Sequence, residues 1–271
     1  MDESLNDAVD RIVSRHREKG ELVLLFDFDG TLVEFADAPA EAVLSGTVRQ
    51  CLAALAALPG TTVGVISGRE LEDLKQKVGL TGLYYAGTDG LELEFEGKVI
   101  THPLVGHCSD LVSRIAETLR PFVTTCPPTW LEQKRFGVTV HYRGLDTQLV
   151  PLLHEGIDQH LAPWAERLHV VTGGKAVEIT PNIGWTKGTA VEFLLDHIDT
   201  DDLHILYAGD EACDVEAMWT VGMKGGISVG VGPGPPTIAE YKLPNAAAVE
   251  RLLEELCRAL GGHRSATTVA P

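Results

Sequence analysis

The sequence lacks the features that mark secreted, zinc-binding and membrane proteins. Its five cysteines contain no Cys-x-x-Cys pair, which argues against a disulfide framework or a zinc site and favours a reducing compartment. No apolar run approaches the ~18 residues that are needed to span a bilayer. The charged amino-terminal segment lacks the apolar stretch of a signal peptide. We therefore predict a cytoplasmic protein that does not associate with membranes.

Positive charge is also scarce. There are 22 Lys and Arg residues against 39 Asp and Glu residues, and the formal net charge is −17. Nucleic-acid-binding proteins need a basic face, so the composition argues against a nucleic-acid partner. If the substrate is an anion, its site must supply local cations against this repulsive background.

The remaining composition is that of a soluble globular protein, with 44% hydrophobic and 23% charged residues among 271. This length allows one large or two ordinary domains. Strand and helix patterns alternate through the first third, which predicts a parallel sheet covered on both faces. The predicted strands are 21–28, 61–68 and 83–87, the helices are 41–58 and 69–79, and residues 91–104 form a hairpin around a Glu-Gly turn.

From about residue 104 the pattern changes to that of an α+β module. It contains predicted helices at 109–120 and 147–165, one antiparallel strand at 130–144, and short strands at 168–174 and 175–181. The first pattern then returns, with helices from 186 and 214, strands 203–210 and 225–232, a helix at 244–262, and a disordered tail at 263–271. The predicted architecture is an α/β core, residues 1–103 and 182–271, interrupted by an inserted module, residues 104–181.

Polar side chains follow the apolar strands of the predicted core at the points where the strands end. Because ligands of parallel α/β sheets bind at the carboxyl ends of the strands, we expect these side chains to meet. They are Asp27 and Asp29 after the first strand, Ser67 after the second, and Asp210 with Asp214 after the strand at 203–210, joined by Lys187 at the start of a helix.

Several carboxylates near one point are tolerated when a hard divalent cation lies among them, and Mg²⁺ combines carboxylates with a substrate phosphate. The period of two in a strand would place Asp27 and Asp29 on the same side, one able to attack phosphorus and the other able to transfer a proton. A lysine opposite them would neutralise charge during phosphoryl transfer. The pattern therefore predicts magnesium-dependent phosphoryl transfer.

In this order the motifs resemble those of the haloacid dehalogenase (HAD) superfamily, whose members combine a Rossmann-like core with, in one class, an inserted C2-type cap. "DFDGT" at 27–31 resembles the first motif, Ser67 the second, Lys187 the third and "GDEACD" at 209–214 the fourth. Within the last motif, the resemblance implies that Asp214 supports the waters of the metal or orients Lys187.

The resemblance also assigns roles. It implies that Asp27 is the nucleophile, which forms an aspartyl phosphate, and that Asp29 is the general acid and base. It implies that Ser67 and Lys187 hold the phosphate, and that Mg²⁺ is bound by Asp27, the carbonyl of Asp29 and Asp210. An acid at the second aspartate position is the pattern of the phosphatases of the superfamily rather than of its ion pumps.

The inserted module resembles that of the trehalose-6-phosphate phosphatase family. "LEQKRFGVTVHYR" at 131–143 is similar to its Glu-x-Lys and His-Tyr-Arg segments, and "GKAVEITPNIGWTKGTA" at 174–190 is similar to its Val-Glu-x-x-Pro stretch. On these residues alone, a solvated strand face would be the simpler interpretation, and we expect His141, Tyr142, Trp130 and Trp185 to be structural. The resemblance implies that the sugar or its phosphate is contacted by Glu132, Lys134, Arg143 and Glu178.

Two positions depart from the family. Asp89, in "AGTDG", stands where the family usually has a histidine, and residues 211–213 read Glu-Ala-Cys where Asp-Arg-Thr is more usual. The first change could alter sugar recognition, so Asp89 is included among the candidate substrate-binding residues. Another glycosyl phosphate, such as glucosylglycerol phosphate or sucrose phosphate, is therefore an alternative substrate.

A phospho-acceptor regulatory domain is a distant alternative from another class of protein. Such a domain also combines an aspartate pair, a hydroxyl and a lysine around Mg²⁺. Its acceptor aspartate follows the third strand, however, and its chain is much shorter than 271 residues. The sequence carries no indication of the oligomeric state.

Overall fold

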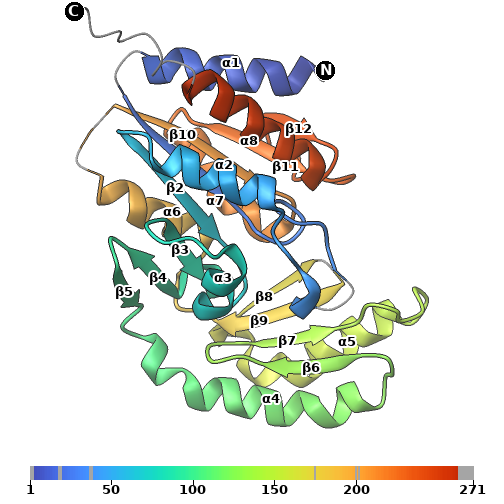
Figure 1. The fold of residues 1–271 in the computed structure, drawn as a ribbon. Helices are drawn as coiled ribbons and strands as arrows, with labels where there is room; N and C mark the ends of the chain where they lie inside the picture. The colour runs from blue at the N-terminus through green and yellow to red at the C-terminus, as the bar shows by residue number, and fades with distance from the viewer. Residues whose placement is uncertain are drawn as a thin grey trace, which may run out of the picture. The chain divides into compact units, whose positions relative to one another are not determined.

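The computed structural model describes residues 3–17, 20–36, 39–173, 175–198, 200 and 202–261. These residues form two compact units (Figure 1). The core unit contains the described residues up to Ile100 and from Thr186 onward, and the inserted unit is Thr101–Trp185. The change of pattern along the sequence sets the corresponding boundaries at residues 104 and 181. No helix among the described residues has the length and apolar character that a membrane crossing requires.

The core unit is built on an eight-stranded sheet in the order β12-β11-β10-β1-β2-β3-β4-β5. The six strands from β12 to β3 pair in parallel, and β4 pairs antiparallel with β3. The strands are β1 (Glu21–Phe26), β2 (Thr61–Ile66), β3 (Tyr84–Gly87), β4 (Glu92–Phe95), β5 (Lys98–Thr101), β10 (Leu203–Gly209), β11 (Ile227–Val231) and β12 (Tyr241–Leu243).

Helices bury both faces of this sheet. On β1, Leu22, Leu24 and Phe26 join a core cluster with residues of α1, α2, α3 and α8, whereas Val23 and Leu25 point to the other face and are equally buried. The helices are α1 (Glu3–Arg17), α2 (Gly46–Ala56), α3 (Leu71–Val78), α6 (Lys187–Asp196), α7 (Val215–Met223) and α8 (Ala246–Gly261). The predicted α/β class, with a sheet covered on both sides, is confirmed.

Local sequence determines several of the helix ends. The Ser45 side chain accepts a hydrogen bond from the backbone N–H of Val48 and begins α2. Gly79 ends α3 in the left-handed conformation, at φ 67°, as the sequence predicts. The Thr186 side chain caps α6, so that Lys187 becomes the first residue of that helix.

Two core elements are absent from the sequence-based assignment. The first is α1, whose buried face contains Ala8, Val9, Ile12 and Val13 at helical spacing within an otherwise charged segment. The second is β12, a three-residue strand whose backbone pairs with β11. Both elements are amphipathic or short, and burial against the rest of the core stabilises them. The tail predicted to be disordered lies outside the described residues.

The inserted unit contains a four-stranded sheet in the order β6-β7-β9-β8, and every neighbouring pair is antiparallel. Two helices pack against one face of it (Figure 1). The elements are α4 (Ser109–Thr124), β6 (Trp130–Gln133), β7 (Val138–His141), α5 (Val150–Leu161), β8 (Leu168–Gly173) and β9 (Ala176–Pro181). Across both units, the described residues also form five short 3₁₀ turns: Pro39–Glu41, Thr88–Gly90, Val105–His107, Ala162–Arg167 and Ala212–Asp214.

Two predictions about this unit are wrong. Residues 130–144 form two strands rather than one, because the chain reverses where the Lys134 N–H donates to the Gly137 carbonyl. Helix α4 does not end at residue 120 but continues past Pro121 to Thr124. Burial of Val123 in the unit's core accounts for the added turn despite the missing proline N–H.

The sheet of the inserted unit has one apolar and one polar face. Val138, Val140, Val177 and Ile179 pack against residues of α4 and α5. The alternate positions, which face the other way, carry polar side chains, and the pairing places them in neighbouring rows. Thr139 pairs with Glu132 on one side and with Glu178 on the other.

Candidate active site

A polar residue directly follows each of the four central parallel strands of the core. The strands β10, β1, β2 and β3 are neighbours in the sheet, so their carboxyl ends lie along one edge. Predicted site residues from distant parts of the sequence are therefore brought together. The residues that follow these strands are Asp210, Asp27, Ser67 and Thr88.

Asp27 and Lys187 form a buried ion pair at this edge. The Lys187 ammonium lies 2.7 Å from Asp27 Oδ1 and 2.8 Å from Asp214 Oδ1. The Lys187 side chain is 2% exposed and the Asp214 side chain 0% exposed. The ammonium group can be buried because it has two carboxylate partners. The position of Lys187 at the start of α6 directs its side chain to this edge.

Asp214 organises this cluster through four hydrogen bonds. Its Oδ1 accepts from the Lys187 ammonium and from the Tyr207 hydroxyl, the latter at 2.6 Å. Its Oδ2 accepts from the backbone N–H groups of Asp210 and Glu211, both at 3.0 Å. Four bonds use the acceptor sites of a carboxylate. Asp214 is thus placed to orient Lys187 and the Asp210 backbone.

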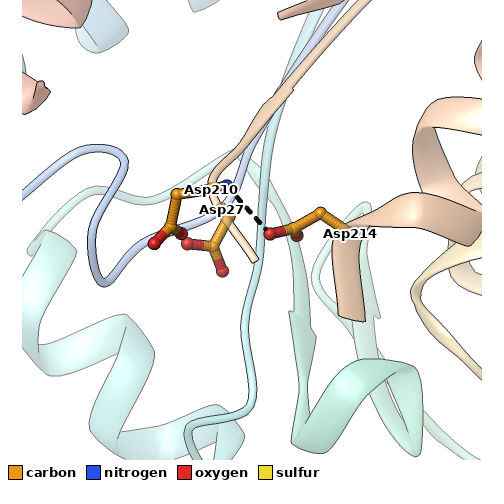
Figure 2. Close-up of side chains that lie close together, drawn as sticks. All are labelled: Asp27, Asp210 and Asp214. Carbon is orange, nitrogen blue, oxygen red and sulfur yellow. Dashed lines mark hydrogen bonds between the residues drawn. The ribbon is translucent and has the colours of Figure 1, made fainter. Parts of the chain in front are cut away.

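Three carboxylates lie close enough together to surround a cation: those of Asp27, Asp210 and Asp214. One oxygen from each lies within 4.8 Å of the others. Figure 2 shows the carboxyl groups of Asp27 and Asp210 close together, with Asp214 reached by the backbone nitrogen of Asp210. The Thr31 hydroxyl donates to Asp210 Oδ1 at 3.3 Å.

Gly30 allows the backbone to pass close to Asp210. Its φ is +86°, and an added Cβ would lie 2.2 Å from Asp210 Oδ2. A larger residue would therefore both strain the turn after Asp29 and displace a carboxylate. The glycine in the first motif is required by this close approach.

The charges of the cluster perturb its titration. Burial and the neighbouring Asp214 and Glu211 carboxylates raise the pKa of Asp210 to about 8. Burial also raises the pKa of Asp27, against the opposing effect of Lys187. Burial disfavours the Lys187 ammonium, but the carboxylates of Asp214 and Asp27 outweigh it and raise the pKa of Lys187. A divalent cation would relieve the repulsion between these carboxylates, so the residues fit a divalent metal.

Asp29 has a different cationic partner. Its carboxylate receives two hydrogen bonds from the Arg69 guanidinium, Nε to Oδ2 at 2.6 Å and NH2 to Oδ1 at 2.7 Å. Strand β1 ends at Phe26, so the period of two that was expected to align Asp27 with Asp29 does not extend to them. Turn contacts place Asp29 instead, among them a bridge to Val33.

Arg69 is not among the predicted site residues, although it lies two residues after Ser67. The available signal is an arginine next to a strand end in a chain with few cations. Tyr207 is also absent from the sequence-based site, because a tyrosine within an apolar strand resembles any other core residue. Its hydroxyl contact with Asp214 becomes evident only once β10 and α7 are folded together.

Ser67 and Asp89 lie in adjacent loops. Ser67 is buried, and its hydroxyl accepts from the Arg69 N–H at 3.2 Å. The Asp89 N–H donates to the Ser67 carbonyl, and the Thr88 N–H donates to the Arg69 carbonyl. Thr88 and Asp89 both adopt positive φ, 48° and 54°, which is a strained conformation for residues other than glycine.

Two of the candidate substrate residues of the inserted unit, Lys134 and Glu178, contact each other, and a third, Glu132, contacts His141. His141 Nε2 lies 2.8 Å from Glu132 Oε2, and the Lys134 ammonium lies 3.4 Å from Glu178 Oε1. Arg143 follows β7 and is partly exposed. Strands β6, β7 and β9 bring Glu132, Lys134 and Glu178 into neighbouring positions within the unit.

Trp130 differs from its predicted role as a packing residue. Its ring stacks on His141, with centroids 3.9 Å apart, yet the residue is 47% exposed. One face of the indole is thus covered by the imidazole next to Glu132, and a large part of the remaining surface meets solvent. Trp130 lies on an edge strand and on the face of the sheet opposite to α4 and α5, which accounts for this exposure.

Comparison with known proteins gives a consistent result. The sequence model of the family described as trehalose-phosphatase matches residues 25–245. The trehalose-phosphate phosphatase of Mycobacterium ulcerans is 34% identical over 206 residues, which cover 74% of this chain and 52% of that protein. A bifunctional trehalose-6-phosphate synthase/phosphatase of Thermoproteus tenax is 32% identical over 254 residues, 92% of this chain and 34% of that protein. The chain thus spans about half the length of the mycobacterial relative.

Solved structures show the same fold. The C-terminal domain of C. albicans trehalose-6-phosphate phosphatase superposes with a TM-score of 0.83 at 21% identity, covering 92% of this chain and 96% of that one. The C-terminal domain of a Candida albicans trehalose synthase regulatory protein gives a TM-score of 0.73 at 14% identity, covering 92% and 98%. Proteins named as an enzyme and as a regulator share this fold, so the fold does not by itself determine activity.

Proposed function

The chain belongs to the trehalose-phosphatase family, and from this premise we propose that it is a phosphatase that hydrolyses trehalose 6-phosphate to trehalose and phosphate. The observation that carries the proposal is the buried cluster at the strand ends, in which Lys187 bonds to both Asp27 and Asp214. Such a cluster combines a nucleophile with a fixed positive charge, as phosphoryl transfer requires.

Mg²⁺ is the proposed cofactor. The ion would be held by the carboxylates of Asp27 and Asp210 and by the carbonyl of Asp29. Asp214 would contribute indirectly, because its hydrogen bonds fix Lys187 and the Asp210 backbone. When bound, the ion would neutralise phosphate charge and the charge of the carboxylates around it. The carboxylate oxygens are hard ligands, which suit Mg²⁺ better than a softer metal.

The first half of the reaction would transfer the phosphoryl group to Asp27. An Asp27 oxygen attacks phosphorus, and the bond between phosphorus and the sugar oxygen breaks. Asp29 gives a proton to that sugar oxygen, which leaves as a hydroxyl group. Ser67 and Lys187 bind the phosphate oxygens and stabilise the charge that develops on them.

The second half would release the phosphate. Asp29, now ionised, takes a proton from a water molecule that attacks the aspartyl phosphate. The bond between phosphorus and the Asp27 oxygen breaks, so Asp27 is regenerated as a carboxylate and inorganic phosphate is formed. Each proton that Asp29 gives in the first half is thus recovered in the second.

The inserted unit would supply the sugar contacts. Carboxylates such as Glu132 and Glu178 accept hydrogen bonds from sugar hydroxyls, and Lys134 and Arg143 provide cations that the acidic chain otherwise has in short supply. The exposed Trp130 ring offers an apolar surface beside Glu132 on which a pyranose ring can pack. Asp89, in the turn that follows β3 of the core unit, is a further candidate for sugar recognition.

We also propose a cytoplasmic location. The described cysteines are all free thiols, which suits a reducing compartment. The partner required by the proposed reaction is a small sugar phosphate.

The decisive test is phosphate release from a panel of sugar phosphates with Mg²⁺ present. Trehalose 6-phosphate is expected to exceed glucose 6-phosphate, sucrose 6-phosphate and glucosylglycerol phosphate clearly in kcat/KM. A clear preference for one of the others would retain the phosphatase and replace the substrate. No phosphate release from any of them would contradict the enzymatic function and favour a regulatory role.

A further inference from the structure

Arg69 links the proposed general acid to the rest of the core site. Its Nε and NH2 groups donate to the two oxygens of Asp29 at 2.6 and 2.7 Å. Its backbone N–H donates to the Ser67 hydroxyl at 3.2 Å, and its carbonyl accepts from the Thr88 N–H at 2.7 Å. One residue thus contacts the loops that carry the proton-transfer group and the phosphate-binding hydroxyl.

The guanidinium group is itself held on its remaining sides. Its NH1 donates to Asp73 Oδ2 at 2.8 Å, and its carbon lies 5.3 Å from the centre of the Phe28 ring, within range of a cation–π contact. The residue is buried, at 9% exposure. The arginine therefore has a defined position independent of any substrate, which is what a positioning group requires.

The backbone around Asp29 is fixed, but its side chain needs a partner to select one orientation. The turn is closed by the Asp29–Val33 bridge and by the Gly30 N–H, which donates to the Val33 carbonyl at 2.7 Å. The two bonds from Arg69 then set the plane of the carboxylate. A carboxyl group has about four hydrogen-bonding sites, so each Asp29 oxygen keeps one that can hold the proton that is given to a substrate oxygen.

We propose that Arg69 is a positioning residue for the proton transfers of Asp29, a role distinct from the charge neutralisation assigned to Lys187. The inference rests on the proposed function. General acid catalysis requires the acid to lie within hydrogen-bond reach of the leaving oxygen. A rigid two-pronged guanidinium can hold a carboxylate in that orientation, whereas a lysine ammonium can bond it only as a point charge.

The need of the leaving oxygen for a proton in the first step provides a way to measure the role of Arg69. As the bond between phosphorus and the leaving oxygen breaks, that oxygen takes a proton from Asp29. A strongly basic leaving oxygen needs this proton, whereas a weakly basic phenolate departs as an anion. Loss of correct proton transfer therefore slows esters of poor leaving groups and spares esters of good ones. A loss of general stability would affect both kinds equally.

The test compares wild type with Arg69→Lys on phenyl, 4-nitrophenyl and 2,4-dinitrophenyl phosphate with saturating Mg²⁺. These esters carry no sugar, so contacts of the inserted unit do not enter. We expect kcat/KM to fall about 10-fold or more for phenyl phosphate, since general acid catalysis contributes ~10²–10⁴-fold in enzymes. For 2,4-dinitrophenyl phosphate the fall is expected to stay below about 3-fold, because that phenolate needs no proton.

Two matched variants control this comparison. Arg49→Lys changes another arginine that contacts the end of α3, where it donates to the carbonyls of Val78 and Lys77. It is expected to leave the dependence on the leaving group as in wild type. Asp29→Asn is expected to show the steep dependence by itself, and adding Arg69→Lys to it should cost little more, because both changes affect one function.

Asp73→Asn keeps the inference testable if Arg69→Lys does not fold. It removes only the contact on the exposed side of the guanidinium and is expected to give a smaller change of the same kind. The role of Arg69 is contradicted if every soluble variant loses the same factor in kcat/KM on all three esters. It is also contradicted if the fold-losses of Arg69→Lys and Asp29→Asn multiply in full in the double variant.

These outcomes are separable from failure of the proposed function. If wild type hydrolyses the aryl esters but not trehalose 6-phosphate, the substrate assignment fails and the Arg69 comparison still decides its own question. If wild type hydrolyses no phosphate ester with Mg²⁺, the phosphatase proposal fails and the role of Arg69 fails with it.

Discussion

The core unit and the inserted unit both gather charged side chains beside a sheet, but they hold them differently. In the core, Lys187 and Asp214 are almost fully buried, and Asp214 alone accepts four hydrogen bonds. In the inserted unit, the Lys134–Glu178 and His141–Glu132 pairs lie on a strand face with partial exposure.

This difference in burial favours different roles for the charged groups of the two units. Buried charges interact strongly and cannot exchange partners with water, so the core cluster is preorganised for one reaction. Exposed pairs are weaker, and their groups can exchange a neighbouring side chain for a sugar hydroxyl at little cost. We therefore expect changes in the core to remove the chemistry itself, and changes in the inserted unit to alter which ester is chosen.

The largest effect is expected from Asp27→Asn. The amide cannot attack phosphorus, and it also removes one charge from the proposed metal site, so turnover of every phosphate ester should be lost. Phosphate release measured at high enzyme concentration checks this, with circular dichroism as the control for folding. Turnover within tenfold of wild type would exclude Asp27 as the nucleophile.

Removal of the metal should be nearly as severe. Excess chelator is expected to abolish activity, and added Mg²⁺ should restore it. Asp210→Asn should raise the Mg²⁺ concentration needed for half-maximal activity steeply, because it removes the negative charge of a proposed ligand next to Asp27 and Asp214. A titration of Mg²⁺ against initial rate decides the point, and full activity in chelator would overturn the metal assignment.

The contrast between the two units is tested directly by pairing Lys187→Ala with Glu132→Ala and Glu178→Ala. The lysine variant should lose activity on trehalose 6-phosphate and on an aryl phosphate alike. Each glutamate variant should lose about 10- to 150-fold in kcat/KM on the sugar phosphate only, the equivalent of one hydrogen bond to a charged group.

The result for the aryl phosphate is the informative one. If Glu132→Ala and Glu178→Ala impair both esters equally, these residues are structural and the sugar-binding role of the inserted unit is wrong. If they impair neither ester, they are solvated side chains and the assignment of trehalose 6-phosphate loses its main support.

The smallest effect is expected at Trp130, where the proposed contact is apolar packing. Trp130→Ala should lower kcat/KM for trehalose 6-phosphate by about 3- to 10-fold, since aromatic packing contributes ~0.5–1.5 kcal/mol beyond buried area. Hydrolysis of the aryl phosphate should be unchanged. Trp130→Phe serves as the conservative control and should retain most of the activity, whereas unchanged activity of Trp130→Ala would remove the residue from the site.

Strand runs and motifs in the sequence are sufficient to predict the fold class and the edge of the sheet at which the candidate site lies. Apolar strand runs alternating with helices impose a parallel sheet, and a parallel sheet brings its carboxyl ends together. Polar residues placed directly after those runs must then meet. Lys187 and Asp27 are 160 residues apart in sequence and 2.7 Å apart in the structure for this reason.

The partner of each charged group depends on contacts that form only in the folded chain. The strand period and the motif predict that Asp29 lies near Asp27. They do not predict that Arg69, 40 residues away from Asp29 in sequence, donates two hydrogen bonds to the Asp29 carboxylate. Tyr207 lies within an apolar strand run and Trp130 is predicted to be structural, yet one is a buried donor to Asp214 and the other a half-exposed ring. Strand and helix patterns report which face of an element is buried, whereas side-chain pairing depends on contacts between elements that the local sequence does not encode.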